Sequence, residues 1–591
     1  MSLEMPQLSE PKTQRDITRV FYGYDHNNKI ANGSWYDTKN TTAEEYPLFR
    51  PRDQWLKVRK LEDPHGMFAL NGLAWVDGEK LYYNSALVDR LTLERSDKQI
   101  IGMGAYMIIF PDKVIYNTAT GEVTWMDQVN SSAGCEIELC LVSGEKYTNQ
   151  VVSGSTPPSD PQNGSYWIDT SSNPAVMKLY NQANKVWGSV QTTYVKISAQ
   201  GIGSGIKADD AVEISGIDAA GCEDLNGSHI VYAAAENYIV VTGIAIGKVT
   251  NSGKVTVART SPELDFVTEH ENRLWGCSNK NHEIYCTALG SPTNWRVYQG
   301  LSTDSYAATV GSPGDFTGCI AHGGYVLFFK QDRIHKMYGS TPNAFQLQEI
   351  SCRGVQAGSH NSLCAVNETL YYKAPNDVCA YTSSLPADIS DAFGNQQFSE
   401  AWAGSQGDVL YSSYIDRTGD PVMFTYDTVK GLWHRQDKIR ARWFANDDGI
   451  LYWIGDDGYI WATGGAEEDN KYGNETTELE RPVHWYAITD DIGMESQSNS
   501  YVGPMSPDQR YMSKIQVRLD VGDRSIVTIS IQYDGDHDTW QEVYRVNTQK
   551  KRSILVPIIP RRHDTVRLKF QGIGSCRIYS FAKTIEDGGL I

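Results

Sequence analysis

The sequence lacks three features that would assign it quickly to a class of protein: an excess of basic residues, a long apolar run and a cluster of cysteines. Its 53 lysines and arginines are outnumbered by 72 aspartates and glutamates, which gives a formal net charge of -19. General electrostatic binding to nucleic acid is therefore not expected, because such binding needs cations that displace the counterions of phosphates. Any contact with DNA should be non-adhesive.

No apolar run is long enough to cross a bilayer, and residues 1–16 contain no apolar centre of the signal-peptide type. We therefore expect no membrane-spanning segment and a chain that is synthesised and folded in a cytoplasm.

The ten cysteines are scattered through apolar, strand-like contexts, which favours buried reduced thiols over a disulfide framework. One group has ligand-like spacing, namely Cys277, His282 and Cys286, but it lacks an obvious fourth ligand for zinc. We therefore expect no metal and no other cofactor. The cysteines are Cys135, Cys140, Cys222, Cys277, Cys286, Cys319, Cys352, Cys364, Cys379 and Cys576.

Long helix-like apolar periods are also scarce, whereas 34 tyrosines, 15 tryptophans and 52 glycines are present. Aromatic side chains cover pleated sheets and glycine serves tight turns, so the composition favours an all-β protein.

The stretch from Asp265 to Tyr298 has the pattern of one antiparallel unit, with short strands separated by polar turns and a last strand starting near Trp295. Imperfect copies of this unit recur roughly every 40 to 50 residues, which is the period of a four-stranded propeller blade. Two copies precede a long interruption and five follow it. The sequence therefore predicts a seven-bladed β-propeller.

The chain order gives five regions. We predict an extended N-terminal arm at 1–65, the first part of the propeller at 66–140, inserted small β domains at 141–255, the remainder of the propeller at 256–470, and a C-terminal β-sandwich domain at 471–591. The arm contains several prolines and no sustained period, so it should be held by something else, and packing on a neighbouring subunit explains it best.

The insertion contains a Ser/Pro/Gly linker followed by Trp167, Tyr180 and Trp187, each separated from the next by a turn. This pattern predicts a very small three-stranded module. The three aromatics either staple a sheet that has no core of its own or stack on a glycan.

The C-terminal region contains the hairpin 533–540, whose Asp-x-Asp-x-Asp run resembles the start of a calcium loop. Thr539 occupies the position of the required glycine, and Arg545 that of the bidentate glutamate, which argues against calcium.

The pieces DFVTEHENRLWGC and EIYCTALGSPTNW, the propeller rhythm with an inserted lobe, and the C-terminal stretch 552–589 together resemble the tail nozzle family of short-tailed bacteriophages, also called tail tubular protein B or DNA-stabilization protein. The resemblance runs from about residue 66 to the C-terminus. It implies a structural virion protein, usually a hexameric ring beneath the portal and its adaptor, that retains packaged genome and conducts double-stranded DNA during ejection. It also implies contacts with tail fibre or tail tip proteins and location in the virion tail, after assembly in the bacterial host cytoplasm.

The resemblance carries no catalytic motif, and we find no nucleophile elbow, zinc-protease motif or phosphate loop in the sequence. We therefore expect no enzyme activity and name no catalytic or cofactor-binding residue. Two alternatives remain: a receptor- or glycan-binding tail protein, and a propeller glycoside hydrolase whose carboxylates come together from distant blades. For a DNA channel, the acidic turn residues Asp447, Asp448, Asp456 and Asp457 are the candidates that face the lumen or its rim.

Overall fold

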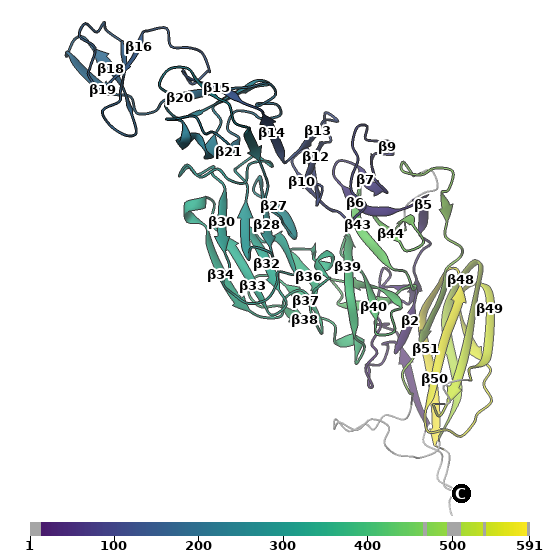
Figure 1. Cartoon of the computed structure of the whole chain (residues 1–591). Helices are drawn as coiled ribbons and strands as arrows, with labels where there is room; N and C mark the ends of the chain where they lie inside the picture. Colours follow the sequence, from purple (N-terminus) through teal and green to yellow (C-terminus); the bar gives the residue numbers. More distant parts are fainter. Residues whose placement is uncertain (1–12, 465–469, 493–509, 536–538, 588–591) are drawn as a thin grey trace, which may run out of the picture. The chain divides into compact units, whose positions relative to one another are not determined.

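The computed structural model describes residues 13–464, 470–492, 510–535 and 539–587 (Figure 1). Regular structure is almost entirely strand, and the all-β expectation is confirmed. The helices within the described ranges are short 3-10 turns, η1 (Glu223–Leu225), η2 (Pro342–Ala344), η3 (His360–Ser362) and η4 (Asp391–Phe393). No helix in this part of the chain is both long and apolar enough to span a membrane.

Contacts divide the chain into two units. The first comprises residues 1–97, 329–334 and 349–591, and the second comprises residues 98–328 and 335–348. Each unit is described by itself below.

Most of the chain outside the insertion forms four-stranded antiparallel sheets in which consecutive strands pair with each other. Such meanders need only short turns, which the sequence supplies as Asp-Gly, Asn-Glu and Pro-Asp pairs. The strands are β6 (Pro64–Ala69), β7 (Leu73–Asp77), β8 (Lys80–Tyr83), β9 (Ala86–Leu87); β10 (Gln99–Met103), β11 (Tyr106–Phe110), β12 (Val114–Asn117), β13 (Val123–Trp125); β27 (Phe266–His270), β28 (Arg273–Ser278), β29 (Glu283–Cys286), β30 (Tyr306–Thr309); β31 (Gly318–His322), β32 (Tyr325–Lys330), β33 (Arg333–Tyr338), β34 (Gln346–Ser351); β35 (Cys364–Val366), β36 (Thr369–Lys373), β37 (Val378–Tyr381), β38 (Ala387–Asp388); β39 (Phe398–Gln406), β40 (Val409–Asp416), β41 (Pro421–Asp427), β42 (Leu432–Arg435); and β43 (Ala441–Asp447), β44 (Ile450–Gly455), β45 (Tyr459–Ala462).

Neighbouring sheets meet through their first strands. In the second unit β27 contacts both β10 and β31, and in the first unit β39 contacts β35 and β43, while β43 contacts β6. Neighbouring sheets also share buried clusters: Trp75 of β7 and Tyr452 of β44 belong to one cluster, and both rings contact Tyr472. Sheets stacked face to face about their first strands are the architecture of a β-propeller.

The template unit differs from its prediction at the fourth strand. Its first three strands and their turns are where the sequence places them, but residues 287–305 form a loop with Trp295 buried, and the fourth strand is β30. The strand start predicted near Trp295 is wrong, because this apolar side chain serves a core shared with Met103 and Phe110 and not a sheet.

The sheet of β43 to β45 is completed by a strand from the other end of the chain. β5 (Leu56–Lys60) pairs antiparallel with β45, and β46 (Glu478–Leu479) pairs with β5 on the far side. Leu56 and Val58 of β5 are buried against this sheet. One sheet is therefore made jointly by residues far apart in the sequence.

The insertion forms three sheets within the second unit. Two of them have the strand orders β14-β26-β21-β22 and β23-β24-β20-β15-β25 and share one apolar core. These two sheets extend from Gln128 to Arg259. Their first strand, β14, and their last strand, β26, pair with each other. Their strands are β14 (Gln128–Ser132), β15 (Cys135–Cys140), β20 (Tyr194–Ser198), β21 (Ala211–Ser215), β22 (Gly227–Ile230), β23 (Ala233–Ala235), β24 (Tyr238–Thr242), β25 (Val249–Asn251) and β26 (Val255–Arg259).

The third sheet contains the aromatic module, which has four strands where three were predicted. They are β16 (Val151–Gly154), β17 (Tyr166–Asp169), β18 (Val176–Asn181) and β19 (Val186–Ser189). β16 lies within the expected linker and pairs in parallel with β17. Parallel pairing across a loop leaves no hairpin signal in the sequence, so this strand could not be read locally.

The C-terminal region forms a sheet with the order β1-β51-β48-β50-β47-β2, and β49 pairs with β48 (Figure 1). The long strand β48 pairs with β51 up to Val521 and with β50 from Ile526 onward, and its pairing with β49 shifts register between these two residues. The strands are β1 (Thr13–Thr18), β2 (Asp37–Lys39), β47 (His484–Ile488), β48 (Arg510–Tyr533), β49 (Gln541–Val556), β50 (Val566–Ile573) and β51 (Cys576–Asp587).

The described part of the N-terminal arm is held by its own chain, which corrects the expectation of packing on a neighbour. β1 and β2 are the end strands of the C-terminal sheet, while β3 (Thr41–Thr42) and β4 (Arg50–Pro51) form a small ladder. Phe21, Trp35 and Phe49 are buried in the core of that sheet, with Trp35 and Phe49 ring centroids 5.2 Å apart. The arm shows no apolar periodicity of its own because its strands and aromatic side chains pack against sheets that are formed by other segments.

Candidate functional site

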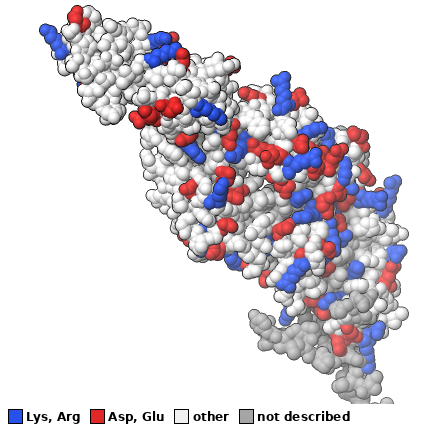
Figure 2. Space-filling view, in the orientation of Figure 1, with Lys and Arg blue, Asp and Glu red and all other residues white. Residues whose placement is uncertain are grey.

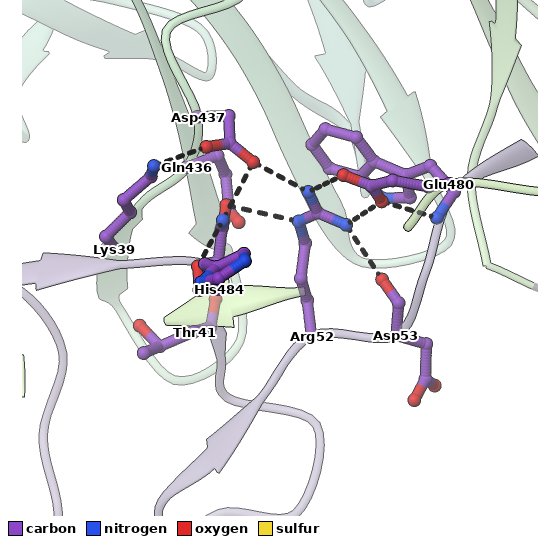
Figure 3. A network of polar contacts seen from close by, with 10 residues as sticks. Lys39, Thr41, Arg52, Asp53, Gln436, Asp437, Glu480 and His484 are labelled. Carbon is purple, nitrogen blue, oxygen red and sulfur yellow. Dashed lines mark hydrogen bonds and ion pairs between the residues drawn. The ribbon is translucent and has the colours of Figure 1, made fainter. Parts of the chain in front are cut away.

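A polar network in the first unit surrounds Arg52, at the place where the arm meets two other segments (Figure 3). One of these segments follows β42 and contains Asp437, and the other lies between β46 and β47 and contains Glu480. We call this set, Lys39, Asn40, Arg52, Trp55, Asp437 and Glu480, the arm junction. It was not found in the sequence, because its members come from three distant stretches with no shared motif.

Arg52 makes a two-pronged ion pair with Glu480. Its Nη1 donates to Oε2 at 2.7 Å and its Nη2 donates to Oε1 at 2.8 Å, while Glu480 Oε2 also accepts from the backbone N–H of Trp55 at 2.9 Å. The Arg52 side chain is only 6% exposed. This bidentate geometry is the strong form of an arginine–carboxylate pair, because two parallel charged hydrogen bonds fix the orientation of both side chains.

Asp437 is the second anion of the junction. Its Oδ2 accepts from Arg52 Nη2 at 3.0 Å and from Asn40 Nδ2 at 2.7 Å, and its Oδ1 pairs with Lys39 Nζ at 2.7 Å. Burial by itself raises the pKa of Asp437, but the hydrogen bond from Lys39 and the charges of Arg52 and Lys39 outweigh it and hold the pKa below its ordinary value. The carboxylate stays ionised in the folded chain.

The guanidinium of Arg52 also lies on an aromatic face. Its Cζ is 3.5 Å from the centroid of the Trp55 ring, so the cation is stacked as well as paired. Arg52 Nε adds a bond to Asn40 Oδ1 at 3.3 Å, and Nη1 adds one to the carbonyl of Asp53 at 2.9 Å. The donors of this buried cation are thus used within the junction.

A second polar layer joins the arm to β42. Thr41 Oγ1 lies 2.8 Å from His434 Nδ1, and Gln436 Nε2 donates to the carbonyl of Thr41 and to Thr425 Oγ1, each at 2.9 Å. Burial lowers the pKa of His434 to about 4, so the ring is neutral near neutral pH. The network therefore depends on a neutral imidazole.

Chemically, the arm junction fastens three segments together. Both of its carboxylates are bonded to the same arginine, and burial of the ions makes each one depend on the others. Both carboxylates therefore have a structural role. They link the arm to the propeller sheets and to the segment that leads into the C-terminal sheet.

The structure places the four acidic turn candidates at two ends of one strand. Asp447 is the last residue of β43 and Asp448 lies in the turn before β44, whereas Asp456 and Asp457 lie in the turn between β44 and β45. Successive turns of an antiparallel meander lie at opposite strand ends, here separated by roughly 20 Å for the six residues of β44. The two pairs are therefore not brought together.

Three of these carboxylates have structural partners. Asp447 accepts from Tyr472 Oη at 2.6 Å and shares Lys471 with Asp448, each 2.8 Å from its Nζ. Asp457 Oδ1 accepts from its own turn and from Trp461 Nε1 at 3.1 Å, while Asp456 is exposed. Figure 2 shows acidic side chains interspersed with basic ones on the face in view.

The structure does not gather Cys277, His282 and Cys286 into a metal site. The two cysteines are buried and free, His282 lies in the exposed turn between their strands, and no group of three metal-ligating side chains occurs among the described residues. Burial raises the pKa of Cys286 to about 12, so it is a protonated core thiol. The Asp536–Asp538 part of the calcium-like hairpin lies outside the described residues.

In the aromatic module, the three rings have different environments. Trp167 is buried, and its Nε1 donates to the carbonyl of Gly154 at 2.9 Å, which ties it to the parallel strand β16. Trp187 packs edge-on against Trp167 with centroids 5.6 Å apart and lies 5.1 Å from Tyr180. Tyr180 and Trp187 are half-exposed. Trp167 is therefore a structural staple, while the other two present part of their faces to solvent.

No protein-family model matches the chain, and a search of curated proteins gives no match. Among solved structures, BamB from Moraxella catarrhalis is similar with a TM-score of 0.33 and 9% identity, over 70% of this chain and 97% of that one. An inactive virginiamycin B lyase from Staphylococcus aureus gives 0.22 and 10% identity, over 36% and 84% of the two chains. An exo-beta-1,3-galactanase from Phanerochaete chrysosporium gives 0.22 and 9%, over 54% and 94%. With TM-scores this low, none of these similarities supports an inference about what this chain does.

Proposed function

We propose that the chain is a structural virion protein that forms the tail nozzle ring of a short-tailed bacteriophage, retaining the packaged genome and conducting DNA during ejection. The order of parts supports this proposal: propeller sheets, an inserted β lobe, further propeller sheets and a C-terminal β domain follow each other as the sequence resemblance implies.

The observation that carries the proposal is the arm junction. A conduit for DNA under pressure must keep its domains together, and here a buried arginine and two carboxylates tie the arm, the propeller sheets and the C-terminal sheet to one another. The shared sheet of β5 and β45 also ties the arm to the propeller sheets through backbone hydrogen bonds. These are the features of a part that bears force.

The finer architecture belongs to the same proposal. The four-stranded sheets that begin with β6, β10, β27, β31, β35, β39 and β43 are the seven blades of one propeller, with β5 as the last strand of the final blade. The C-terminal sheet is a sandwich whose two layers share β48 and β49, since β48 changes partner from β51 to β50 along its length.

The partners follow from the function. The chain assembles with copies of itself into a ring of six, contacts portal-adaptor proteins on one side and tail fibre or tail tip proteins on the other, and lets double-stranded DNA pass without adhesion. It acts in the virion tail after assembly in the host cytoplasm. The acidic pairs at Asp447 and Asp456 then border opposite ends of a blade and not one rim.

Immunogold labelling of tailed particles tests this function. An antibody raised against the purified chain should label the tail of intact virions, at the junction with the head. Label on free fibres only, or no label on particles at all, would exclude a nozzle.

A glycan-binding tail protein is the second candidate, and the half-exposed pair Tyr180 and Trp187 favours it. Partly exposed aromatic faces can stack on sugar rings. Binding of host polysaccharide by the wild-type chain, lost in Trp187→Ala, would support this role, and release of free sugar in the same assay would instead indicate a hydrolase.

A further inference from the structure

The outer face of the C-terminal sheet carries a basic groove. The strands β1, β51, β48 and β49 lie side by side there, and their inward residues, among them Val517, Ile554 and Phe581, form the core. The alternate residues point outward and line a groove of about 550 Å³. Its cations are Arg15, Arg19, Arg518 and Lys551, which we call the basic face.

The basic face differs from the other ionic clusters in the described part of the chain. None of its four cations forms an ion pair with a carboxylate among the described residues. Arg15 donates to the amide oxygen of Gln516 at 3.3 Å, and Lys551 lies 3.9 Å from the ring centroid of Tyr579. In a chain with a net charge of -19, four exposed cations on one face, without carboxylate partners there, favour an anionic partner.

Two apolar side chains lie on or beside this face. Ile17 lines the groove and is 44% exposed, and Leu555, which pairs with the groove residue Gln516, is 57% exposed. A phosphate backbone would gain nothing from them, whereas a polypeptide can cover them with an apolar residue of its own. The chemistry of the face is therefore that of a protein interface with an acidic partner.

The groove ends at an open strand edge. Within the described residues β1 pairs with β51 on one side only, so its other edge can accept a further strand. Along this edge the outward residues Arg15 and Ile17 lie at alternate positions of β1, and Arg19 directly follows the last strand residue, Thr18. An added strand that runs one residue past β1 would place its own alternate residues beside a cation, an apolar side chain and a second cation.

We propose that this edge and the basic face bind an extended acidic segment of a partner protein, which adds to β1 as a new strand. The segment has the alternation acidic, any, apolar, any, acidic, so that two carboxylates meet Arg15 and Arg19 and an apolar side chain covers Ile17. Further carboxylates along the segment reach Arg518 and Lys551. Like charges facing these arginines would be repelled, which makes the edge selective.

The test uses the full chain and a fluorescein-labelled peptide in which glutamate, valine and glutamate alternate with threonine. Fluorescence anisotropy should show saturable binding. Two altered peptides separate the causes: lysine in place of glutamate removes the charge match, and N-methylated threonines remove the backbone ladder. Each change should weaken binding at least about tenfold.

Chain variants complete the test. Arg15→Glu and Arg518→Glu should each weaken binding at least about tenfold without changing the thermal midpoint, and Ile17→Asp provides a second route if either variant misfolds. Arg417→Glu, an exposed arginine in the turn after β40, is the matched control and should bind like wild type. Three results would overturn the proposal: no binding of the glutamate peptide, equal binding of the N-methylated peptide, or tighter binding of a short DNA duplex.

Discussion

Two arginines of the same N-terminal arm, Arg15 and Arg52, lie in opposite environments. Arg52 is buried, stacked on Trp55 and paired with two carboxylates, whereas Arg15 is exposed and, within the part of the chain that the structure describes, donates to an amide oxygen and forms no ion pair. The amino acid is the same in both places. Burial and carboxylate partners, and not the residue type, therefore decide the role of an arginine. A buried, paired arginine stabilises the fold, whereas an exposed, unpaired one can bind a partner protein.

Removing the buried cation should have the largest effect. Arg52→Ala leaves the largely buried Glu480 without the cation that it pairs with and leaves Asp437 with Lys39 alone, which should cost about 3–5 kcal/mol of unfolding free energy. The matched control, Arg15→Ala, should change it by less than about 0.5 kcal/mol. Urea unfolding of both variants measures the two costs, and equal losses would abolish the distinction between the two sites.

The pH dependence of stability should reveal the neutral imidazole of the junction. The pKa of His434 is lowered by burial from 6.5 to about 4, so the unfolded chain binds more protons between these values. The contribution of His434 is therefore fully favourable above about pH 6.5 and is lost as the pH falls toward 4, by about 3 kcal/mol in all.

The variant His434→Gln isolates this contribution. The gap in unfolding free energy between wild type and variant should narrow as the pH falls from 7 to 4.5, because the glutamine does not titrate. A gap that stays constant across this range would show that His434 does not titrate as its burial implies.

Removing only the charge of Glu480 should have a smaller effect than removing Arg52. Glu480→Gln keeps the shape of the side chain but replaces a charged acceptor pair with a neutral amide, which should cost about 1.5–3 kcal/mol. The exposed Glu62→Gln is the control. If Glu480→Gln proved neutral, the ion pair would be replaceable, and the junction would hold through packing on Trp55 alone.

The elements that could be predicted from the sequence are the hairpins, whose signals lie within a short stretch of residues. Turns such as Asp77-Gly78 and Asp457-Gly458, flanked by alternating apolar residues, gave the hairpins of β7 with β8 and of β44 with β45. Each hairpin is closed by residues next to it in the sequence, so its signal is complete within a short window.

What the sequence did not predict depends on distant partners. β5 and β1 look featureless because their pairing partners, β45 and β51, lie hundreds of residues away in the sequence. The parallel strand β16 has no turn signal, and Arg52 gains its role only from Glu480 and Asp437. Of the candidate site, the acidic turns were found as turns, but the arm junction was not foreseen.

The prediction with the smallest expected change concerns the affinity of the chain for duplex DNA. With 72 acidic and 53 basic residues, the assembled chain should show little affinity for duplex DNA at physiological salt, because acidic surfaces remove the gain from counterion release. Arg15→Glu with Arg518→Glu should leave this weak binding unchanged. Tight duplex binding that vanishes in the double variant would mean that the basic face holds DNA and not a protein.

Electron microscopy of the purified wild-type chain would show directly whether it forms the ring of a tail nozzle. We expect ring-shaped particles with an open centre wide enough for duplex DNA. Particles that remain single chains at every concentration, or assemblies with a closed centre, would contradict the assignment to a tail nozzle.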